Sequence, residues 1–294
     1  MTHKKYGRKM ALILMIAGLA FLYGCGNTQK SDASTTSQAT SSKSSAQSTA
    51  SQAVSAASST SSTTAAASSR PTFPSTVPAT VVAPSTKADA SYLDDAVFIG
   101  DSVSLKLKNY VTAKRKTDAG FFGKAQFLTA GSMGSGNALQ PLSSSSIHPL
   151  YNGKKALLED NVAAMGAKKI YIMLGINDIA MYGVDDSVKN MGTLLNKIKA
   201  KSPNVHIFVE SATPMIEALQ MTSLNNPNIA AYDVKLSELC KAKGYSFVDV
   251  ASVMRDKEGN LPLEYCSDPN ILGMHFTDKA CQIWNDYILT HTVK

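Results

Sequence analysis

Cysteine is scarce in this 294-residue chain, which contains four of them. Cys25 stands near the N-terminus, and Cys240, Cys266 and Cys281 are widely spaced along the rest of the sequence. Zinc sites need closely paired Cys or His ligands, and this spacing lacks them. The sequence therefore argues against a metal site, and we expect neither a metal nor a cofactor. One disulfide is compatible with export, but the spacing does not select a pair.

The part of the chain expected to fold also lacks an excess of charge. The whole chain carries +7, but residues 1–90 hold 8 of the 29 Lys+Arg and only 2 of the 22 Asp+Glu. Residues 91–294 are left with 21 Lys+Arg and 20 Asp+Glu, a net charge near +1. Nucleic-acid-binding domains concentrate positive charge. The basic balance of the whole chain therefore does not indicate a nucleic-acid partner, and none is expected.

Large apolar residues are almost absent from residues 26–90, which are rich in Ser, Thr and Ala. Such a segment cannot bury enough surface to offset the loss of chain entropy on folding. We expect a disordered tether here, stiffer where prolines occur towards its end. The folded domain is predicted to span residues 91–294, which is long enough for one sizeable core.

Residues 1–25 have the organisation of an export signal. A basic stretch at residues 2–9 precedes an apolar run at residues 10–23, which is short for a membrane span. Leu22 and Gly24 before Cys25 resemble a bacterial lipobox, with Tyr23 bulkier than usual. This predicts an extracytoplasmic protein anchored to the membrane through lipid on Cys25. An ordinary signal peptide or an uncleaved anchor remains the alternative.

Five short apolar runs in residues 91–294 predict buried strands, and segments of helical periodicity separate most of them. The runs are nearly continuous instead of alternating, as in strands covered on both faces. Repetition of strand and helix predicts a parallel sheet in a three-layer α/β fold. The expected strands are residues 96–100, 126–130, 169–175, 205–211 and 245–250. The expected helices are residues 103–111, 154–167, 185–203, 228–244, with Gly244 as C-cap, and 277–292.

Polar residues follow two of these strands where a site in such a sheet is expected, at the carboxyl ends. In "FIGDSVS", Ser102 follows the first strand and opens a helix, so its hydroxyl is accessible and its backbone N–H favours negative charge. In "LGINDIAMYG", Asn177 follows the third strand and can donate to an oxyanion. Taken singly, Ser102 is also compatible with a helix cap, and Asn177 with a turn.

A glycine-rich loop, "TAGSMGSGN", follows the second strand and allows a backbone N–H to approach a ligand closely. We select Gly131 as that donor, with Gly134 as its competitor. His275, in "ILGMHFTD", lies just before the last helix, with Thr277 as the expected cap. The other histidines are less promising. They are His206 within a strand and expected in the core, His148 in a loop, His291 near the C-terminus and His3 in the signal.

These blocks, in this order and spacing, resemble the SGNH (GDSL) hydrolase family over residues 92–290. The resemblance implies a flavodoxin-like α/β/α fold and esterase, lipase or carbohydrate acylesterase activity. It implies that Ser102 is the nucleophile and His275 the general base. It also implies an oxyanion hole formed by the Ser102 and Gly131 backbone N–H groups and the Asn177 side chain.

The last block departs from the family pattern D-x-x-H, because Leu272 occupies the position of the aspartate. A missing carboxylate can cost about four orders of magnitude in rate. Three readings stay open. Asp268 supplies the carboxylate from a longer loop, with residues 269–272 as an insertion; a carbonyl or water holds His275 in a Ser-His dyad; or the site is weak or inactive. Asp268 could also be an ordinary turn-capping residue.

Together these features predict a membrane-tethered serine esterase that removes O-acyl groups from cell-wall or extracellular carbohydrate. An O-acetyltransferase that uses the same site is the first alternative. A non-catalytic glycan-binding or assembly protein is the second. The acyl chain, the alcohol and the oligomeric state are not specified by the sequence.

Overall fold

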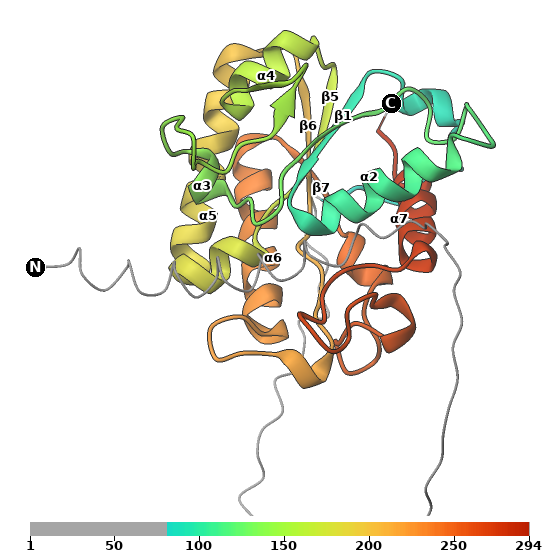
Figure 1. The fold of residues 1–294 in the computed structure, drawn as a ribbon, viewed down its shortest axis with the longest axis vertical. Coiled ribbons are helices and arrows are strands. Elements are labelled where there is room, and N and C mark those ends of the chain that lie inside the picture. The colour runs from blue at the N-terminus through green and yellow to red at the C-terminus, as the bar shows by residue number, and fades with distance from the viewer. Residues whose placement is uncertain (1–80, 294) are drawn as a thin grey trace, which may run out of the picture.

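The computed structural model describes residues 81–293, and Figure 1 shows a central sheet with helices on both faces. The sheet has five strands in the order β2-β1-β5-β6-β7, and every neighbouring pair is parallel. This confirms the predicted α/β class and the five predicted strands. The strands are β1 (Ala96–Gly100), β2 (Gln126–Thr129), β5 (Lys169–Met173), β6 (His206–Glu210) and β7 (Ser246–Val248).

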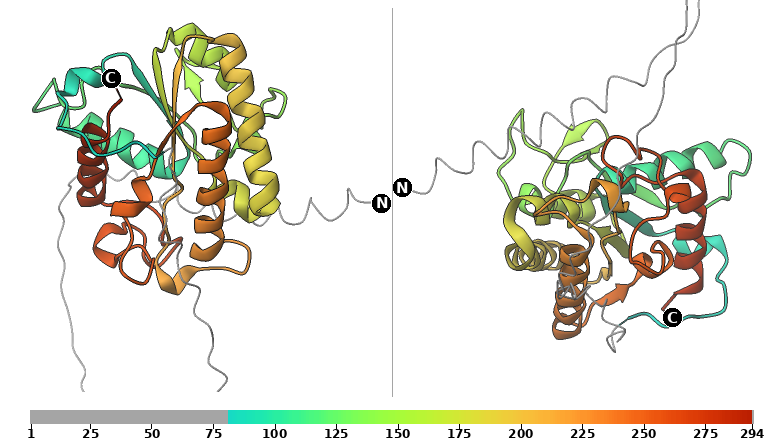
Figure 2. Two further views of the ribbon diagram at one scale, coloured as in Figure 1. Left: turned by 180° about the vertical axis from the view of Figure 1, so that it is seen from behind. Right: turned by 90° about the horizontal axis from the view of Figure 1, so that it is seen from below.

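Two groups of helices sandwich the sheet, which completes the three predicted layers (Figure 2). Helix α2 packs against α7 on one face, and α5 packs against α4 and α6 on the other. No helix within residues 81–293 has the length and apolar character needed to cross a membrane. The helices are α2 (Ser102–Lys114), α3 (Ser135–Ala138), α4 (Leu158–Met165), α5 (Ile176–Lys201), α6 (Asn226–Lys243) and α7 (Asp278–Thr290).

Capping residues explain where several helices begin and end. Asp101 caps α2 by accepting a hydrogen bond from the Val103 N–H at 2.9 Å, and Thr277 caps α7 by accepting from the Ala280 N–H. Gly244 ends α6 with φ 70°, in the left-handed region that favours glycine. The predicted caps at Thr277 and Gly244 are therefore confirmed.

Helix α5 differs from its prediction, because it begins at Ile176 and not at residue 185. Gly183 interrupts it with φ 76°, so two helices meet there at a kink. The predicted segment is the second of the two. Short elements were also not expected, because they are too short to establish a period. They are α3, the hairpin of β3 (Leu150–Tyr151) and β4 (Lys154–Lys155), and several 3-10 turns.

The folded part begins earlier than residue 91, which corrects the predicted end of the tether. Residues 81–89, here called the strap, pack on the domain. Val81 forms a parallel bridge with Phe247 of β7, and Val82 is buried with its N–H on the Phe247 carbonyl at 2.8 Å. These valines supply large apolar side chains, which are almost absent from the rest of the predicted tether. The predicted signal, Cys25 and residues 26–80 lie outside the described residues.

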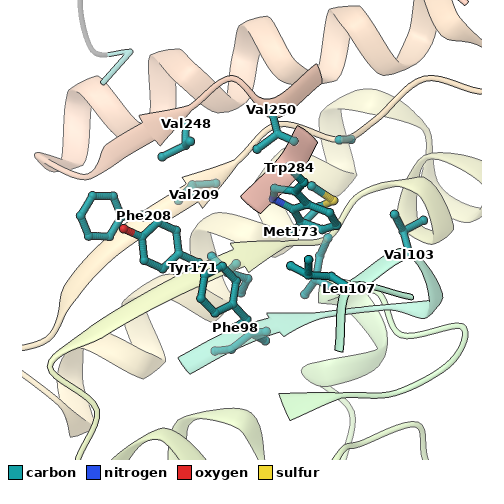
Figure 3. Close-up of a cluster of buried hydrophobic side chains, with 14 of the residues drawn as sticks. Phe98, Val103, Leu107, Tyr171, Met173, Phe208, Val209, Val248, Val250 and Trp284 are labelled. Atoms are coloured by element: carbon teal, nitrogen blue, oxygen red, sulfur yellow. The ribbon is translucent and has the colours of Figure 1, made fainter. Parts of the chain in front are cut away.

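Aromatic rings cross the sheet and form the centre of the core (Figure 3). Phe98 stacks on Tyr171 with ring centroids 4.7 Å apart, and Tyr171 stacks on Phe208 at 4.4 Å. Trp284 of α7 is fully buried, and its indole N–H donates to the buried Glu210 carboxylate at 2.7 Å. This packing fixes α7, whose first turn directly follows His275. The expectation that His206 lies in the core is wrong, because it is exposed at the start of β6.

Candidate active site

The carboxyl ends of β1 and β5 bring together the segments that carry Ser102 and Asn177. Gly100 and Met173 are register partners at the ends of these neighbouring strands, so the residues that follow share one edge of the sheet. The Asn177 side-chain nitrogen donates to Asp101 Oδ2 at 3.0 Å. A side chain on Gly100 would meet Ser104 Oγ at 2.0 Å and the Met173 carbonyl at 2.8 Å. Glycine therefore permits this close approach of β1, α2 and β5.

Ser102 is the first residue of α2, and it is partly exposed at the start of the helix. Its hydroxyl forms no hydrogen bond with any other residue in the described part of the chain. The free backbone N–H groups at a helix N-terminus favour negative charge nearby. The position thus combines an accessible hydroxyl with a favourable environment for an anion.

His275 is held by Asp268, the residue proposed from the longer loop. His275 Nδ1 lies 2.6 Å from Asp268 Oδ2, and both side chains are about nine-tenths buried. Burial opposes the charge on Asp268, but the hydrogen bond and charge of His275 lower the pKa of this carboxyl below its ordinary value. The carboxylate is therefore charged at neutral pH and fixes the orientation of the ring.

The other ring nitrogen, His275 Nε2, is buried and has no hydrogen-bond partner among the described residues. An unpaired buried polar atom is costly, so such atoms call for an explanation. A neutral imidazole with Nδ1–H donated to a carboxylate presents Nε2 as a proton acceptor. The arrangement is the one that a general base requires.

A compact turn carries Asp268 back to His275 across the unusual spacing. The Asp268 carbonyl accepts hydrogen bonds from the N–H groups of Ile271 at 3.0 Å and Gly273 at 3.1 Å. Gly273 has φ 69°, and a side chain there would meet Ile216 at 2.6 Å. Leu272, at the usual aspartate position, packs against the core instead. The extra residues are absorbed by this turn.

The Asn177 side-chain amide, the expected oxyanion donor, already donates hydrogen bonds to two other groups of the protein. Its nitrogen donates to Asp101 Oδ2 at 3.0 Å and to the Met133 carbonyl at 3.2 Å. An amide nitrogen carries two hydrogens, so both are engaged. A developing oxyanion must compete with one of these acceptors for Asn177.

Asp101, which accepts a hydrogen bond from Asn177, is a buried carboxyl with a raised pKa. Burial raises the pKa of Asp101 to about 6, although hydrogen bonds from the start of α2 and the nearby His275 favour its charged form. Asp101 therefore binds a proton over a pH range in which exposed aspartates are ionised.

In the glycine-rich loop, Gly134 lies against the residues that follow β5. The Met133–Gly134 peptide contacts Asn177 through its carbonyl, and a side chain on Gly134 would lie 2.8 Å from the Asp178 carboxylate. The Asp178 carboxylate accepts from the Ser135 N–H at 2.7 Å and the Gly136 N–H at 2.8 Å. Asp178 thus anchors the loop, a role that the sequence motif did not indicate.

The remaining histidines lie in other environments. His148 is buried, with Nδ1 3.0 Å from Ser146 Oγ and Nε2 3.3 Å from the Ala138 carbonyl. His206 pairs with Ser246, and His291 stacks on Tyr287. The three cysteines Cys240, Cys266 and Cys281 are buried thiols without a disulfide. Within residues 81–293, no three His, Cys, Asp or Glu side chains gather as metal ligands.

Residues 135–283 match the sequence model of the GDSL-like lipase/acylhydrolase family. The match includes Asn177, Asp268 and His275, and Ser102 lies before it. A comparison with curated proteins found no significant match.

Solved structures similar to this chain include a GDSL-like lipase from Bacteroides thetaiotaomicron. It is 16% identical, with a TM-score of 0.48, and the alignment covers 67% of this chain and 87% of that one. Another is the periplasmic domain of a lipopolysaccharide acetyltransferase from Salmonella ser. Paratyphi A. It is 14% identical, with a TM-score of 0.45, and 65% and 80% of the two chains are covered.

The family model covers about half of the chain, including the Asp268–His275 pair and most of the sheet. The resemblance noted in the sequence is therefore confirmed. The chain belongs to the GDSL-like lipase/acylhydrolase family.

Proposed function

We propose that this protein is a serine esterase in which Ser102 is the nucleophile, His275 the general base and Asp268 the residue that orients it. The observation that carries the proposal is the buried Asp268–His275 pair, with Nδ1 2.6 Å from the carboxylate and Nε2 left without a partner. Of the three readings of the Leu272 departure, this geometry supports the triad over the dyad. The family to which the chain belongs supports acyl-ester chemistry.

The reaction proceeds in two halves. Ser102 Oγ attacks the ester carbonyl while its proton passes to His275 Nε2, and the intermediate collapses as His275 returns that proton to the departing alcohol. Water, deprotonated by the same nitrogen, then attacks the acyl-enzyme, and His275 returns this proton to Ser102 Oγ as the acid is released. Asp268 stays charged throughout and stabilises the imidazolium that forms in each half.

The oxyanion is stabilised by the Ser102 backbone N–H, by the Asn177 side chain and by one glycine N–H of the loop. For that glycine we propose Gly134 in place of Gly131. Gly134 belongs to the peptide in contact with Asn177, and it lies where a side chain would collide with Asp178.

We further propose that the enzyme acts outside the cytoplasm, anchored through lipid on Cys25, on O-acyl groups of cell-wall or extracellular carbohydrate. The support is the signal-like sequence of residues 1–25 and the Ser/Thr-rich composition of the residues that follow. A long tether of this composition suits a substrate within the cell wall. Palmitate labelling of the full chain and of Cys25→Ala tests the anchor, and equal labelling of both would reject it.

Turnover of a short-chain chromogenic ester tests the catalytic assignment. We expect Ser102→Ala to lose at least a thousandfold in kcat and all labelling by a fluorophosphonate. Ser104→Ala is the matched control, because it removes a buried hydroxyl two residues along the same helix. Ser104→Ala should retain both the turnover of the ester and the labelling by the fluorophosphonate. Equal turnover by wild type and Ser102→Ala would reject Ser102 as the nucleophile.

Partition of the acyl group separates the esterase from its alternatives. Release of free acid in the presence of an added sugar supports hydrolysis, whereas acyl sugar as the main product would identify an O-acetyltransferase. A wild-type protein that neither turns over esters nor reacts with the fluorophosphonate would instead be a non-catalytic carbohydrate-binding protein.

A further inference from the structure

Cys266 lies beside the proposed catalytic pair, on a segment that is paired with the segment carrying His275. Cys266 and Phe276 form an antiparallel bridge, and the Ser267 N–H donates to the His275 carbonyl at 2.8 Å. The Cys266 side chain is buried, with 5% of the residue exposed. The backbone pairing therefore fixes the thiol relative to Asp268 and His275.

The thiol makes a direct contact with the carboxylate. Cys266 Sγ lies 3.3 Å from Asp268 Oδ1, at the distance of a hydrogen bond with sulfur as donor. The same oxygen accepts from the backbone N–H groups of Met274 at 3.2 Å and His275 at 3.0 Å. Within residues 81–293, Cys266 provides the side-chain donor to Oδ1, and Oδ2 is left for His275 Nδ1.

The direction of this hydrogen bond follows from the protonation states of its two groups. Burial raises the pKa of the Cys266 thiol to about 11, so the sulfur keeps its proton at neutral pH. The Asp268 carboxylate is charged there and can only accept. The thiol is thus the donor under any conditions in which the pair would work as a base.

We propose that Cys266 is a positioning residue for catalysis, whose S–H holds the Asp268 carboxylate in the orientation that directs Oδ2 to His275 Nδ1. This inference rests on the proposed function of the Asp268–His275 pair. It accounts for a buried cysteine that takes part in no disulfide in the structure.

A measurable consequence concerns the basicity of His275. A donor on Oδ1 withdraws charge from the carboxylate, which weakens its attraction for the imidazolium. The Met274 and His275 N–H groups still hold Oδ1 when the thiol is absent, so the gain in negative charge on the carboxylate outweighs the loss of orientation. Removing the donor should therefore raise the pKa of His275, and a stronger donor should lower it. The expected order is Cys266→Ala above wild type, and wild type above Cys266→Ser, because a hydroxyl donates more strongly than a thiol.

Two other groups near the pair are the same in every variant. Asp101 lies within electrostatic range of His275, and Lys106 within range of Cys266. Neither is altered in the variants. Cys240→Ala and Cys281→Ala serve as controls, since each removes a sulfur from a site as buried as Cys266 but without a contact to Asp268.

The experiment is a pH titration of the full chain labelled with ¹⁵N-histidine, followed by NMR. The chain has five histidines, and the His275 signal is assigned by its absence from His275→Gln. We expect Cys266→Ala to raise the His275 pKa by about 0.3 to 0.5. The two control variants should leave it unchanged.

Kinetics with the chromogenic ester supply a second readout. Cys266→Ala should lower kcat about threefold to tenfold with KM nearly unchanged, because the thiol does not contact substrate. The acid limb of the pH profile of kcat should move to higher pH in Cys266→Ala. Cys266→Ser should keep kcat within about twofold of wild type.

Several outcomes would overturn the proposal. An unchanged His275 pKa in Cys266→Ala would reject it. A loss of kcat equal to that of Cys281→Ala, with no shift in the acid limb of the pH profile of kcat, would also reject it. If Cys266→Ala fails to fold, the serine variant decides, and a His275 pKa equal to that of wild type would reject the proposal. The NMR titration needs no turnover, so it distinguishes failure of this inference from failure of the esterase assignment.

Discussion

Asp268 receives hydrogen bonds on both carboxylate oxygens, and the shortest comes from His275 Nδ1 at 2.6 Å. Its replacement by asparagine keeps the shape but removes the charge that stabilises the imidazolium. We expect Asp268→Asn to reduce kcat by about a thousandfold to ten-thousandfold on the chromogenic ester.

Asp256→Asn is the matched control for this change. Asp256 is also an aspartate in a turn, where its carboxylate accepts from the Glu258 and Asn260 N–H groups, and it is exposed. Its variant should retain activity. A loss of less than tenfold in Asp268→Asn would favour a Ser-His dyad in which other groups hold the ring.

Glu210 is a second buried carboxyl with a testable consequence. Burial raises the pKa of Glu210 to about 8, and the Trp284 hydrogen bond offsets only part of this. Because its pKa is higher in the folded state, the protonated Glu210 carboxyl contributes to the free energy of unfolding. This contribution is fully present below the unfolded pKa of about 4.3, and it is lost as the pH rises through about 8. Wild type should therefore lose stability over this window.

Glu210→Gln keeps an acceptor for the Trp284 indole and cannot ionise. We expect it to unfold in urea with a free energy about 1 to 3 kcal/mol above that of wild type at pH 8. The difference should shrink towards pH 5, where Glu210 is protonated in the folded protein. A difference that does not depend on pH would show that Glu210 is not the titrating group.

At the residue scale, local rules located Ser102, Asn177 and His275 because each follows a recognisable strand or precedes a helix. Asp268 could be proposed only from a mismatch, since Leu272 left the usual position without a carboxylate. Cys266 and Asp178 were not identified, because their roles depend on contacts across the folded chain. The choice between Gly131 and Gly134 likewise depends on which peptide meets Asn177.

At the scale of elements, the turn from Asp268 to Gly273 determines whether the carboxylate reaches His275. Gly273 combines a left-handed backbone with a close contact to Ile216, and both penalise a side chain. We expect Gly273→Ala to lower the free energy of unfolding by about 2 to 4 kcal/mol and to reduce kcat as Asp268 moves.

Gly153→Ala separates the two causes. Gly153 has φ 75°, but a side chain there meets no atom within 4 Å. Its substitution should cost about 1 kcal/mol from backbone strain alone and leave kcat unchanged. Equal effects of the two substitutions, measured by urea unfolding and ester turnover, would contradict a specific role for the Ile216 contact.

Elements with a clear period were predicted well, and short or interrupted ones were not. The five strands and the later helices have continuous apolar runs or regular stripes, which fix their identity. The start of α5 was missed because Gly183 breaks its period, and α3 is too short to show one. The ends of helices were recognised where a capping residue such as Thr277 or Gly244 was present.

For the whole molecule, the strap decides where a stable domain begins. It buries Val82, and its backbone N–H groups at Ser85 and Ala88 donate to the end of α7 at 2.6 and 2.7 Å. A chain that starts at residue 81 should match the full chain in Tm. A chain that starts at residue 91 should be less stable by about 2 to 4 kcal/mol.

Thermal unfolding of the two truncated chains measures this difference. Equal Tm values would show that the strap adds nothing to stability. The sequence placed the boundary at residue 91 because Val81 and Val82 are isolated apolar residues next to a polar segment. Only their partners, Phe247 and the end of α7, show that they belong to the core.

The strap also determines how the domain would bear a mechanical load. Any pull on the chain ahead of Val81 is received first by the hydrogen bonds to Phe247, Leu289 and Thr290, at the edge of β7 and the far end of α7. Asp268 and His275 precede the opposite end of that helix. Tension would therefore detach the strap before it deformed the Asp268–His275 pair. A domain pulled from its N-terminal side would keep the geometry of this pair.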